Sequence, residues 1–308
     1  MDRVLLCLDV GGTEIKGAAI KNGRLITQIR HFPARANLNK EELLRHFADI
    51  FLELANMIPA LSVDGLRMAF PGPFDYENGI CLLQGLDKFD ALFGVNLRDA
   101  LFGRLSALVN DPMQIRFLND VAAFALGELN FGSAVDTKRS MFVCIGTGCG
   151  SAFGLGNRLA PDGTPGVPPQ GYIYPYPFLD SNIDDYISKR GLQKLAMQYT
   201  GQPLEGRELA DLAHKGDSSA ARCFAQFGDH LCQALKPFLA DYQPNCLCIG
   251  GQVTKSIAMF GRELEKYCLA HEIHLHVTAN TSEKTIQGIY GNTAEHAKGK
   301  ALREDSTW

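Results

Sequence analysis

One stretch near the start of the chain decides the fold: Asp9-Val10-Gly11-Gly12-Thr13-Glu14-Ile15-Lys16. It lies between two apolar runs, and this pattern predicts a tight turn between two strands. The two glycines let backbone N–H groups approach an anion, and the acid at the strand end can orient Mg²⁺ through water. A plain hairpin turn explains the same residues. Taken alone, the stretch leaves both interpretations open.

The same pattern returns in the second half of the chain. An apolar run at 141–145 precedes Gly146-Thr147-Gly148-Cys149-Gly150, and another apolar run follows. Each copy continues into a hairpin signal and an Arg-Leu pair, at 22–25 and 156–159, which indicates a weak internal duplication. Neither turn is a Walker loop or a Rossmann fingerprint, because Gly-Lys-Ser/Thr is absent and a strand, not a helix, follows each turn. Two matched turns predict two lobes that close on one triphosphate.

A polar pair, Asn119 and Asp120, ends a strand predicted at 115–118 and opens a helix predicted at 120–130. In one interpretation, either residue is only the helix N-cap. In the other, Asp120 accepts a proton from an attacking hydroxyl. Phosphoryl transfer requires little beyond such a base, positioning, a metal and charge stabilisation. The spacing alone favours the cap.

Composition narrows the class of protein. A length of 308 residues predicts two domains, and 46% hydrophobic with 21% charged residues is typical of a globular protein. The net charge of −4, without a Lys/Arg cluster, argues against nucleic acid as a partner. No stretch approaches the roughly 20 apolar residues that cross a bilayer. The nine cysteines lie mostly in apolar runs, which suits reduced thiols in the cytoplasm.

These motifs together resemble those of the ROK sugar kinases, a family with the ribonuclease-H-like, actin/hexokinase-type fold. The resemblance covers nearly the whole chain, and five segments follow the family's order. Residues 9–16 and 146–150 resemble its two phosphate motifs, and 70–74 its Gly-Pro-Gly-hydrophobic segment. Residues 119–128 resemble the segment that carries the catalytic Asp, and 249–253 the adenosine motif.

The resemblance implies an α/β fold of two lobes around an interdomain cleft. The small lobe is expected at 1–118, with a possible C-terminal helix at 291–303, and the large lobe at 119–290. A kinase of this family moves a phosphoryl group from ATP to a sugar hydroxyl with Mg²⁺, which implies Asp120 as the base, Asn119 as a sugar ligand and Asp9 near Mg²⁺ through water. The other nucleotide contacts are expected from Gly11, Gly12, Thr13, Lys16, Gly146, Thr147, Gly148, Gly150, Gly250 and Gly251. The resemblance also favours a homodimer.

The chain departs from the family in one loop. Where many members carry Glu and His that touch the sugar, Pro169 and Tyr172 stand instead. No Cys occurs between Cys149 and Cys223, so no structural zinc is expected. Polyphosphate-glucokinase-like members also lack the zinc motif.

Other residues are therefore expected to read the sugar. Gln170 and Tyr172 offer hydrogen bonds and a stacking face, and Gln84 and Asp87 lie where family members contact sugar from the small lobe. The tyrosines of this loop can equally pack it onto its domain or build a subunit contact. The residues alone leave both roles open.

Three rival functions remain at this point. A sugar-responsive transcription regulator of the family would need a DNA-binding domain ahead of Asp9, and the position of Asp9 argues against one. A catalytically silent sugar-binding protein is compatible with the altered loop, although both glycine turns and Asp120 favour an enzyme. A polyphosphate-dependent glucokinase-like enzyme would share every motif discussed here.

Overall fold

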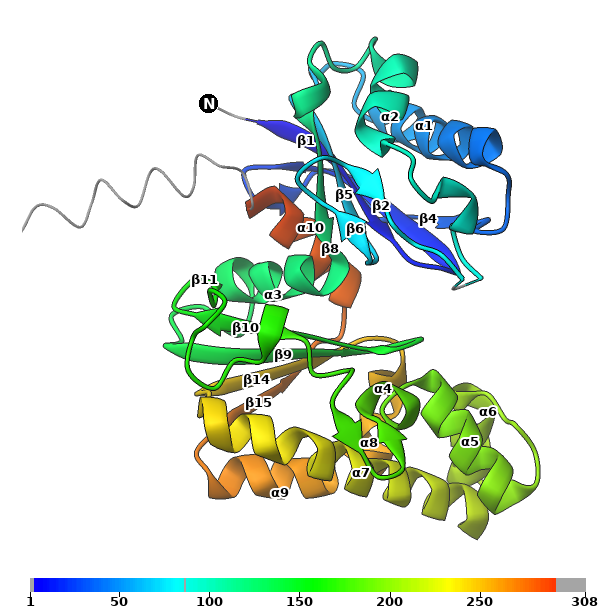
Figure 1. Ribbon diagram of the computed structural model, residues 1–308, viewed down its shortest axis with the longest axis vertical. Coiled ribbons are helices and arrows are strands. Elements are labelled where there is room, and N and C mark those ends of the chain that lie inside the picture. Colours follow the sequence, from blue (N-terminus) through cyan, green and yellow to red (C-terminus); the bar gives the residue numbers. More distant parts are fainter. Residues whose placement is uncertain (1–2, 86, 292–308) are drawn as a thin grey trace, which may run out of the picture. The chain divides into compact units, whose positions relative to one another are not determined.

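The computed structural model describes residues 3–85 and 87–291 (Figure 1). The described residues form two compact units, one holding residues 3–85, 87–131 and 282–291, the other Gly132–Thr281. The sequence placed the lobe boundaries at 118/119 and 290/291. The difference arises because helix α3 (Asp120–Phe131) and helix α10 (Thr281–Gly291) pack on the sheet of the first unit. The helix predicted at 291–303 lies outside the described residues beyond Gly291.

A mixed sheet with the strand order β3-β2-β1-β5-β8 forms the centre of the first unit, and β4 also pairs with β2. Strands β1, β5 and β8 run parallel, whereas β2 is antiparallel to β1, β3 and β4. Parallel strands end at one edge of a sheet, so Asp9, Phe70 and Asn119 come to the same edge. The strands are Val4–Val10 (β1), Glu14–Lys21 (β2), Arg24–Leu25 (β3), Arg30–Pro33 (β4), Gly65–Phe70 (β5) and Ile115–Asn119 (β8).

Helices cover both faces of this sheet. Helices α1 (Lys40–Asn56) and α2 (Leu97–Leu105) lie side by side on one face, and α3 and α10 pack on the other (Figure 1). Helix α1 begins as its sequence predicts, because Asn39 Oδ1 accepts a hydrogen bond from the Glu42 N–H in a capping box. The unit also contains a small hairpin of β6 (Phe74–Asp75) and β7 (Ile80–Cys81), and the 3₁₀ turns η1 (Asp90–Leu92) and η2 (Pro112–Gln114).

The second unit repeats the strand pattern of the first. Its sheet has the order β11-β10-β9-β14-β15, with β9, β10 and β11 antiparallel and β9, β14 and β15 parallel. This arrangement agrees with the internal duplication expected from the two glycine turns. The strands are Arg139–Ile145 (β9), Cys149–Leu155 (β10), Arg158–Leu159 (β11), Cys246–Gly250 (β14) and His274–Val277 (β15).

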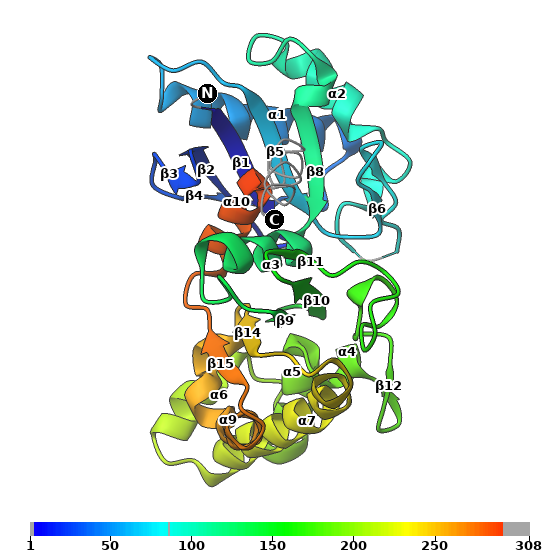
Figure 2. The same ribbon diagram turned by 90° about the vertical axis from the view of Figure 1, so that its left-hand side faces the viewer.

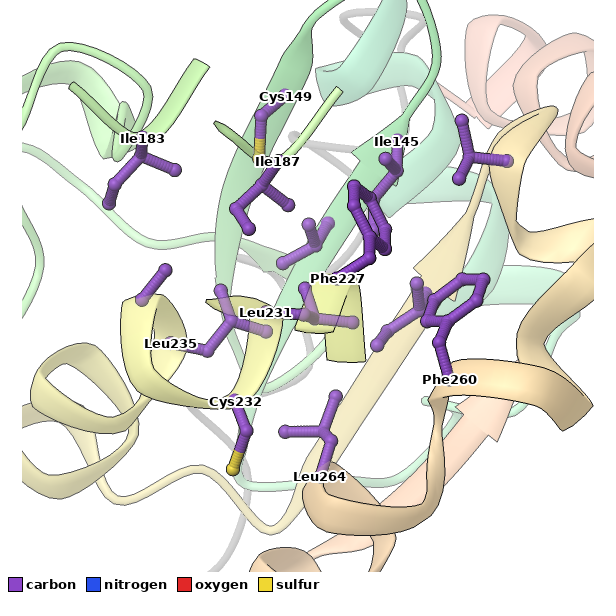
Figure 3. Close-up of a cluster of buried hydrophobic side chains, with 14 of the residues drawn as sticks. Ile145, Cys149, Ile183, Ile187, Phe227, Leu231, Cys232, Leu235, Phe260 and Leu264 are labelled. Carbon is purple, nitrogen blue, oxygen red and sulfur yellow. The ribbon is translucent and has the colours of Figure 1, made fainter. Parts of the chain in front are cut away.

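A helical layer buries one face of the second sheet, and its core fixes both ends of the second glycine turn. Ile145 and Cys149, which flank that turn, point into a cluster with Phe227 and Leu231 of the long helix α7 (Figure 3). Helix α7 lies beside α9 in both views (Figures 1 and 2). The helices are α4 (Ile183–Tyr186), α5 (Lys189–Thr200), α6 (Gly206–His214), α7 (Ser218–Tyr242), α8 (Ile257–Phe260) and α9 (Arg262–Ala270).

Two segments of the second unit differ in detail from the sequence expectation. The pattern at 184–199 predicts one helix, but α4 ends at Tyr186 and a new helix, α5, begins after Ser188, whose hydroxyl oxygen caps it by accepting from the Gly191 N–H. The loop at 160–182 is irregular as expected, except for the turn η3 (Pro169–Gly171) and a short hairpin of β12 (Pro177–Phe178) and β13 (Ser181–Asn182). Another 3₁₀ turn, η4 (Val253–Ser256), follows β14. Within residues 3–85 and 87–291, every helix is too short or too polar to cross a membrane.

Candidate active site

The first glycine turn is a tight reversal between β1 and β2. The Gly11 N–H donates to the Glu14 carbonyl oxygen over 3.0 Å, and a Cβ on Gly11 would lie 2.9 Å from that oxygen. Gly12 and Thr13 are exposed at the tip, where the Thr13 carbonyl accepts from the Ala34 N–H. The turn therefore presents an open glycine backbone, as an anion site of this kind requires.

Asp9 lies at the base of this turn in a network of polar side chains. Burial raises the pKa of Asp9 to about 6, and the nearby charge of Asp120 adds to the rise. Hydrogen bonding to Ser282 and the charge of Lys16 oppose it. Lys16 Nζ donates to Ser282 Oγ over 2.9 Å and lies 3.6 Å from Glu14 Oε2. Lys16, predicted to contact nucleotide, is thus already held beside Asp9 by the protein itself.

The structure separates the roles of Asn119 and Asp120. Asn119 Oδ1 accepts hydrogen bonds from the backbone N–H groups of Val121 and Ala122, each over 3.0 Å, so Asn119 caps α3. Its Nδ2 donates to Tyr76 Oη over 3.3 Å. Asp120 follows the cap as the first residue of the helix. The cap that the spacing favoured is therefore present, and because Asn119 supplies it, the Asp120 carboxylate is not needed as the cap of α3.

Asp120 is partly exposed, yet its surroundings disfavour the charged carboxylate. Burial raises the pKa of Asp120, and four features partly oppose this rise: the Val121 N–H, which donates to Oδ1 over 3.0 Å, the charge of Lys88, the backbone N–H of Asp120 itself, and the Asn119 side chain. A carboxylate with a raised pKa is a better proton acceptor than an ordinary surface Asp. Lys88 belongs to none of the sequence motifs.

The second glycine turn is held by a carboxylate for which the sequence predicted no role. Asp184 of α4 accepts from the Cys149 backbone N–H through Oδ1 over 2.6 Å and from Arg190 Nη2 through Oδ2 over 2.5 Å. A Cβ on Gly148 would lie 2.6 Å from Asp184 Oδ1, which explains the glycine. The Gly146 carbonyl accepts from the Lys189 N–H at the start of α5, and nothing lies within 4 Å of a Cβ built on Gly146. Thr147 is exposed at the tip, and Gly150 follows in β10.

The Gly250-Gly251 turn lies next to the second glycine turn, because β9 and β14 are parallel neighbours. Gly250 pairs with Cys144 at the end of β14. Gly251 has φ +100°, and a Cβ there would lie 2.3 Å from the Ile145 carbonyl oxygen. Its N–H donates to Thr281 Oγ1 over 2.9 Å. Only glycine fits this position, and the two turns share one edge of the sheet.

The Tyr-rich loop is tied to the strand that follows the second glycine turn. Ser151 Oγ donates to the Gly171 carbonyl over 2.6 Å and accepts from the Ile173 N–H over 2.9 Å. Tyr172 is half-buried, with its ring centroid 5.6 Å from that of Tyr174. Gln170 is exposed, and its N–H donates to Asp162 Oδ1. The sugar contacts predicted for Gln170 and Tyr172 stay predictions.

In the first unit, Gln84 and Asp87 are both exposed. The Asp87 N–H donates to Asp90 Oδ2 over 3.2 Å. No interaction in the described part of the chain assigns either side chain a role in substrate binding, and their predicted sugar contacts also stay predictions.

Comparison with known proteins identifies the family. The model of the ROK family matches residues 5–296. The chain belongs to the ROK family. It is 25% identical over 287 residues to a glucokinase of Thermotoga maritima, covering 85% of this chain and 86% of that protein. It is 23% identical over 283 residues to an N-acetyl-D-glucosamine kinase of Aliivibrio salmonicida, covering 85% and 88%.

Among solved structures, a ROK hexokinase from Thermus thermophilus has the same fold. The TM-score is 0.76 at 19% identity, and the match covers 97% of this chain and all of that one. This likeness confirms the α/β fold of the actin/hexokinase type that the motifs implied. The match of the family model confirms the recognition of the family.

The described residues contain no cluster of side chains that would bind a metal ion by themselves. Within residues 3–85 and 87–291, no group of three or more His, Cys, Asp or Glu side chains is placed to hold a metal ion. His274 and His276 stand on β15, the edge strand of the second sheet. Asp9 offers a carboxylate. In proteins, one or two such carboxylates commonly hold the Mg²⁺ ion that is bound to a nucleotide.

Proposed function

We propose that this ROK family protein phosphorylates the hydroxyl of a hexose or hexose derivative with ATP, and that Asp120 is the general base. One observation carries the proposal. Asn119 performs the capping of α3, which leaves Asp120 at the strand edge with a raised pKa beside the first glycine turn. Family membership and the names of the relatives support a sugar kinase in general.

The proposed reaction assigns separate work to the residues of each unit. Asp120 takes the proton of the sugar hydroxyl, whose oxygen attacks the terminal phosphorus of ATP while ADP leaves. The glycine turns at 11–13 and 146–148 are the candidates to donate backbone N–H groups to phosphate oxygens, and Gly250-Gly251 is the candidate contact for adenosine. Asp9 would hold Mg²⁺ through water, and the ion supplies charge neutralisation when bound. Asn119 Nδ2 and the Tyr-rich loop are the candidates for sugar recognition.

A substrate screen tests this function. ADP release from ATP-Mg²⁺ is measured with glucose, mannose, N-acetylglucosamine, N-acetylmannosamine and other hexose derivatives, and the same panel is repeated with polyphosphate as donor. Sugar-dependent ADP release is the expected result. Sugar phosphorylation with polyphosphate but not with ATP would show that polyphosphate is the phosphoryl donor. Sugar binding by calorimetry without turnover on either donor would contradict the kinase and favour a silent binding protein.

Asp184 provides a prediction about the second glycine turn. Asp184→Ala removes the acceptor of the Cys149 N–H, and an unpaired, partly buried N–H costs about 1–3 kcal/mol. We expect the KM for ATP to rise roughly tenfold or more, the equivalent of about 1.4 kcal/mol. Asp184→Asn keeps an acceptor oxygen, so its KM for ATP should rise much less. The matched control is Asp185→Ala, because Asp185 contacts Ser181 and Lys194 instead of the turn. Equal KM values for all three variants would contradict the role of Asp184.

A further inference from the structure

Lys88 is fixed over the first glycine turn by its neighbour in sequence. The Phe89 ring is fully buried, 5.4 Å from the Phe70 ring and 5.9 Å from the Phe47 ring between centroids. The Phe89 N–H also donates to the Ala36 carbonyl over 2.8 Å. Since Phe89 is anchored in the core, the backbone that carries Lys88 is held in place beside it.

The Lys88 side chain runs across Gly12. A Cβ built on Gly12 would lie 3.1 Å from Lys88 Cδ and 3.8 Å from Lys88 Cβ. The aliphatic stem therefore lies against Gly12, and the ammonium nitrogen is more than 4 Å from this Cβ position. The charge of Lys88 lowers the pKa of Asp120, which opposes the effect of burial. The ammonium group thus belongs to the surroundings of both the glycine turn and the proposed base.

The two carboxylates of this site have different cationic neighbours. Asp9 is accompanied by Lys16, whose Nζ is already engaged by Ser282 and Glu14. Within residues 3–85 and 87–291, no hydrogen bond or ion pair holds the ammonium group of Lys88. Lys88 is only partly exposed, so an anion that arrives at Gly12 meets a cation already in position.

We propose that Lys88 binds the phosphoryl group in transfer, as a catalytic residue that supplements the glycine turn. This inference rests on the proposed function. As the sugar oxygen forms its bond to phosphorus, the bond to the ADP oxygen breaks and its electron pair leaves with ADP. The hydroxyl proton goes to Asp120. Lys88 keeps its proton throughout and donates hydrogen bonds to the phosphoryl oxygens, where charge accumulates.

Binding measurements separate a phosphoryl contact from simple packing. In Lys88→Met, an uncharged stem still covers Gly12. We expect the affinity for AMP-PNP, an ATP analogue with a terminal phosphoryl group, to fall about tenfold or more, while the affinity for ADP changes less than about threefold. Equal losses for both ligands, or none, would overturn the proposal. Lys40→Met is the control for loss of one charge, since Lys40 is exposed at the start of α1.

Kinetics on the best sugar of the panel give the second readout. Lys88→Met should lower kcat by roughly 10²-fold, as for loss of one preorganised donor, and Lys88→Arg should restore part of it. Among the described residues, Asp9 and Lys88 are the charged groups whose electrostatic interaction with Asp120 shifts a pKa. Removing the positive charge should therefore move the acid limb of the kcat/KM profile to higher pH. An unchanged kcat and an unchanged acid limb would contradict the catalytic role.

The two proposals fail in different ways. If the wild-type protein transfers phosphate to no sugar, the proposed function fails, yet the comparison of AMP-PNP with ADP still tests the Lys88 contact. If the wild type is a sugar kinase and Lys88→Met matches it in kcat and in AMP-PNP affinity, only the Lys88 proposal fails. A wild type that binds neither nucleotide would overturn both.

Discussion

Asp120→Asn is expected to lower kcat for sugar phosphorylation by about 10²–10⁴-fold, the usual contribution of a general base. The amide keeps the shape of the side chain and an oxygen that can accept the Val121 N–H, but it does not take up the hydroxyl proton. Asn119 still caps α3, so the start of the helix should persist. Nucleotide affinity, measured by calorimetry, should change little because the expected phosphate contacts lie in the glycine turns.

Asp99→Asn is the matched control for this substitution. Asp99 is exposed in the first turn of α2 and accepts from Asn96 Nδ2, away from the strand edge that carries Asp120. It loses the same charge from a helix start in the same unit, and its kcat should remain that of the wild type. If Asp120→Asn kept kcat within about threefold of the wild type, well below the contribution expected of a base, Asp120 would have no role in proton transfer.

Local signals in the sequence were sufficient to predict the elements around the site. The two glycine turns lie between strands as predicted, and Asn39 caps α1 three residues before the Glu that completes the box. Such features depend on neighbours within a few residues, and the pattern of polar and apolar positions records them directly. The five motifs in order then indicated the ROK family, and the match of the family model confirms that membership.

The choice between Asn119 and Asp120 shows where local reasoning stops. Either side chain satisfies the residue preference of an N-cap, so spacing alone does not assign the roles. In the folded protein, Asn119 Oδ1 reaches the N–H groups of Val121 and Ala122, and its amide reaches Tyr76 from a distant hairpin. That tertiary contact orients Asn119 and leaves Asp120 as the residue with a raised pKa.

The contacts of Lys88 and Asp184 with the glycine turns were not predicted, because no local pattern in the sequence indicates them. Each acts at a glycine turn far from it in sequence: Lys88 covers Gly12, and Asp184 contacts the Cys149 N–H. Their positions depend on how an intervening segment packs, through Phe89 in one case and helix α4 in the other. Long-range packing of this kind leaves no periodic signal.

Helix α10 is another element that the pattern did not predict. Its sequence alternates small and polar residues with few large apolar ones, and Ile286 and Ile289 are its main buried side chains. The helix is stabilised by close approach to α3, and that approach depends on glycines rather than on an apolar stripe. Tertiary packing thus overrides a weak local preference.

Gly288→Ala is expected to destabilise the protein strongly, because α3 and α10 touch through their backbones. A Cβ on Gly288 would lie 1.7 Å from the Ala123 carbonyl oxygen, and one on Gly127 would lie 1.9 Å from that of Lys284. Overpacking of this kind typically costs about 1–3 kcal/mol, and more where backbone must move. We expect a loss of at least about 3 kcal/mol in the free energy of unfolding for either Ala variant, measured by urea denaturation.

Gly103→Ala separates this clash from a general effect of replacing a helical glycine. Gly103 is exposed in α2, and nothing lies within 4 Å of a Cβ built on it. The better helix propensity of Ala should stabilise that variant by roughly 0.5–1 kcal/mol. The two substitutions should change the free energy of unfolding in opposite directions, because a facing backbone occupies the space of the new methyl group at Gly288 but not at Gly103.

The same contact links stability to the site. Helix α3 begins with Asp120, and Ser282, which binds Lys16 and Asp9, lies in the first turn of α10. A methyl group at 288 that pushes the helices apart must therefore shift one of these residues relative to the first sheet. We expect folded Gly288→Ala to lose kcat as well as stability. A variant with normal unfolding free energy and normal kcat would show that the two helices do not need this close approach.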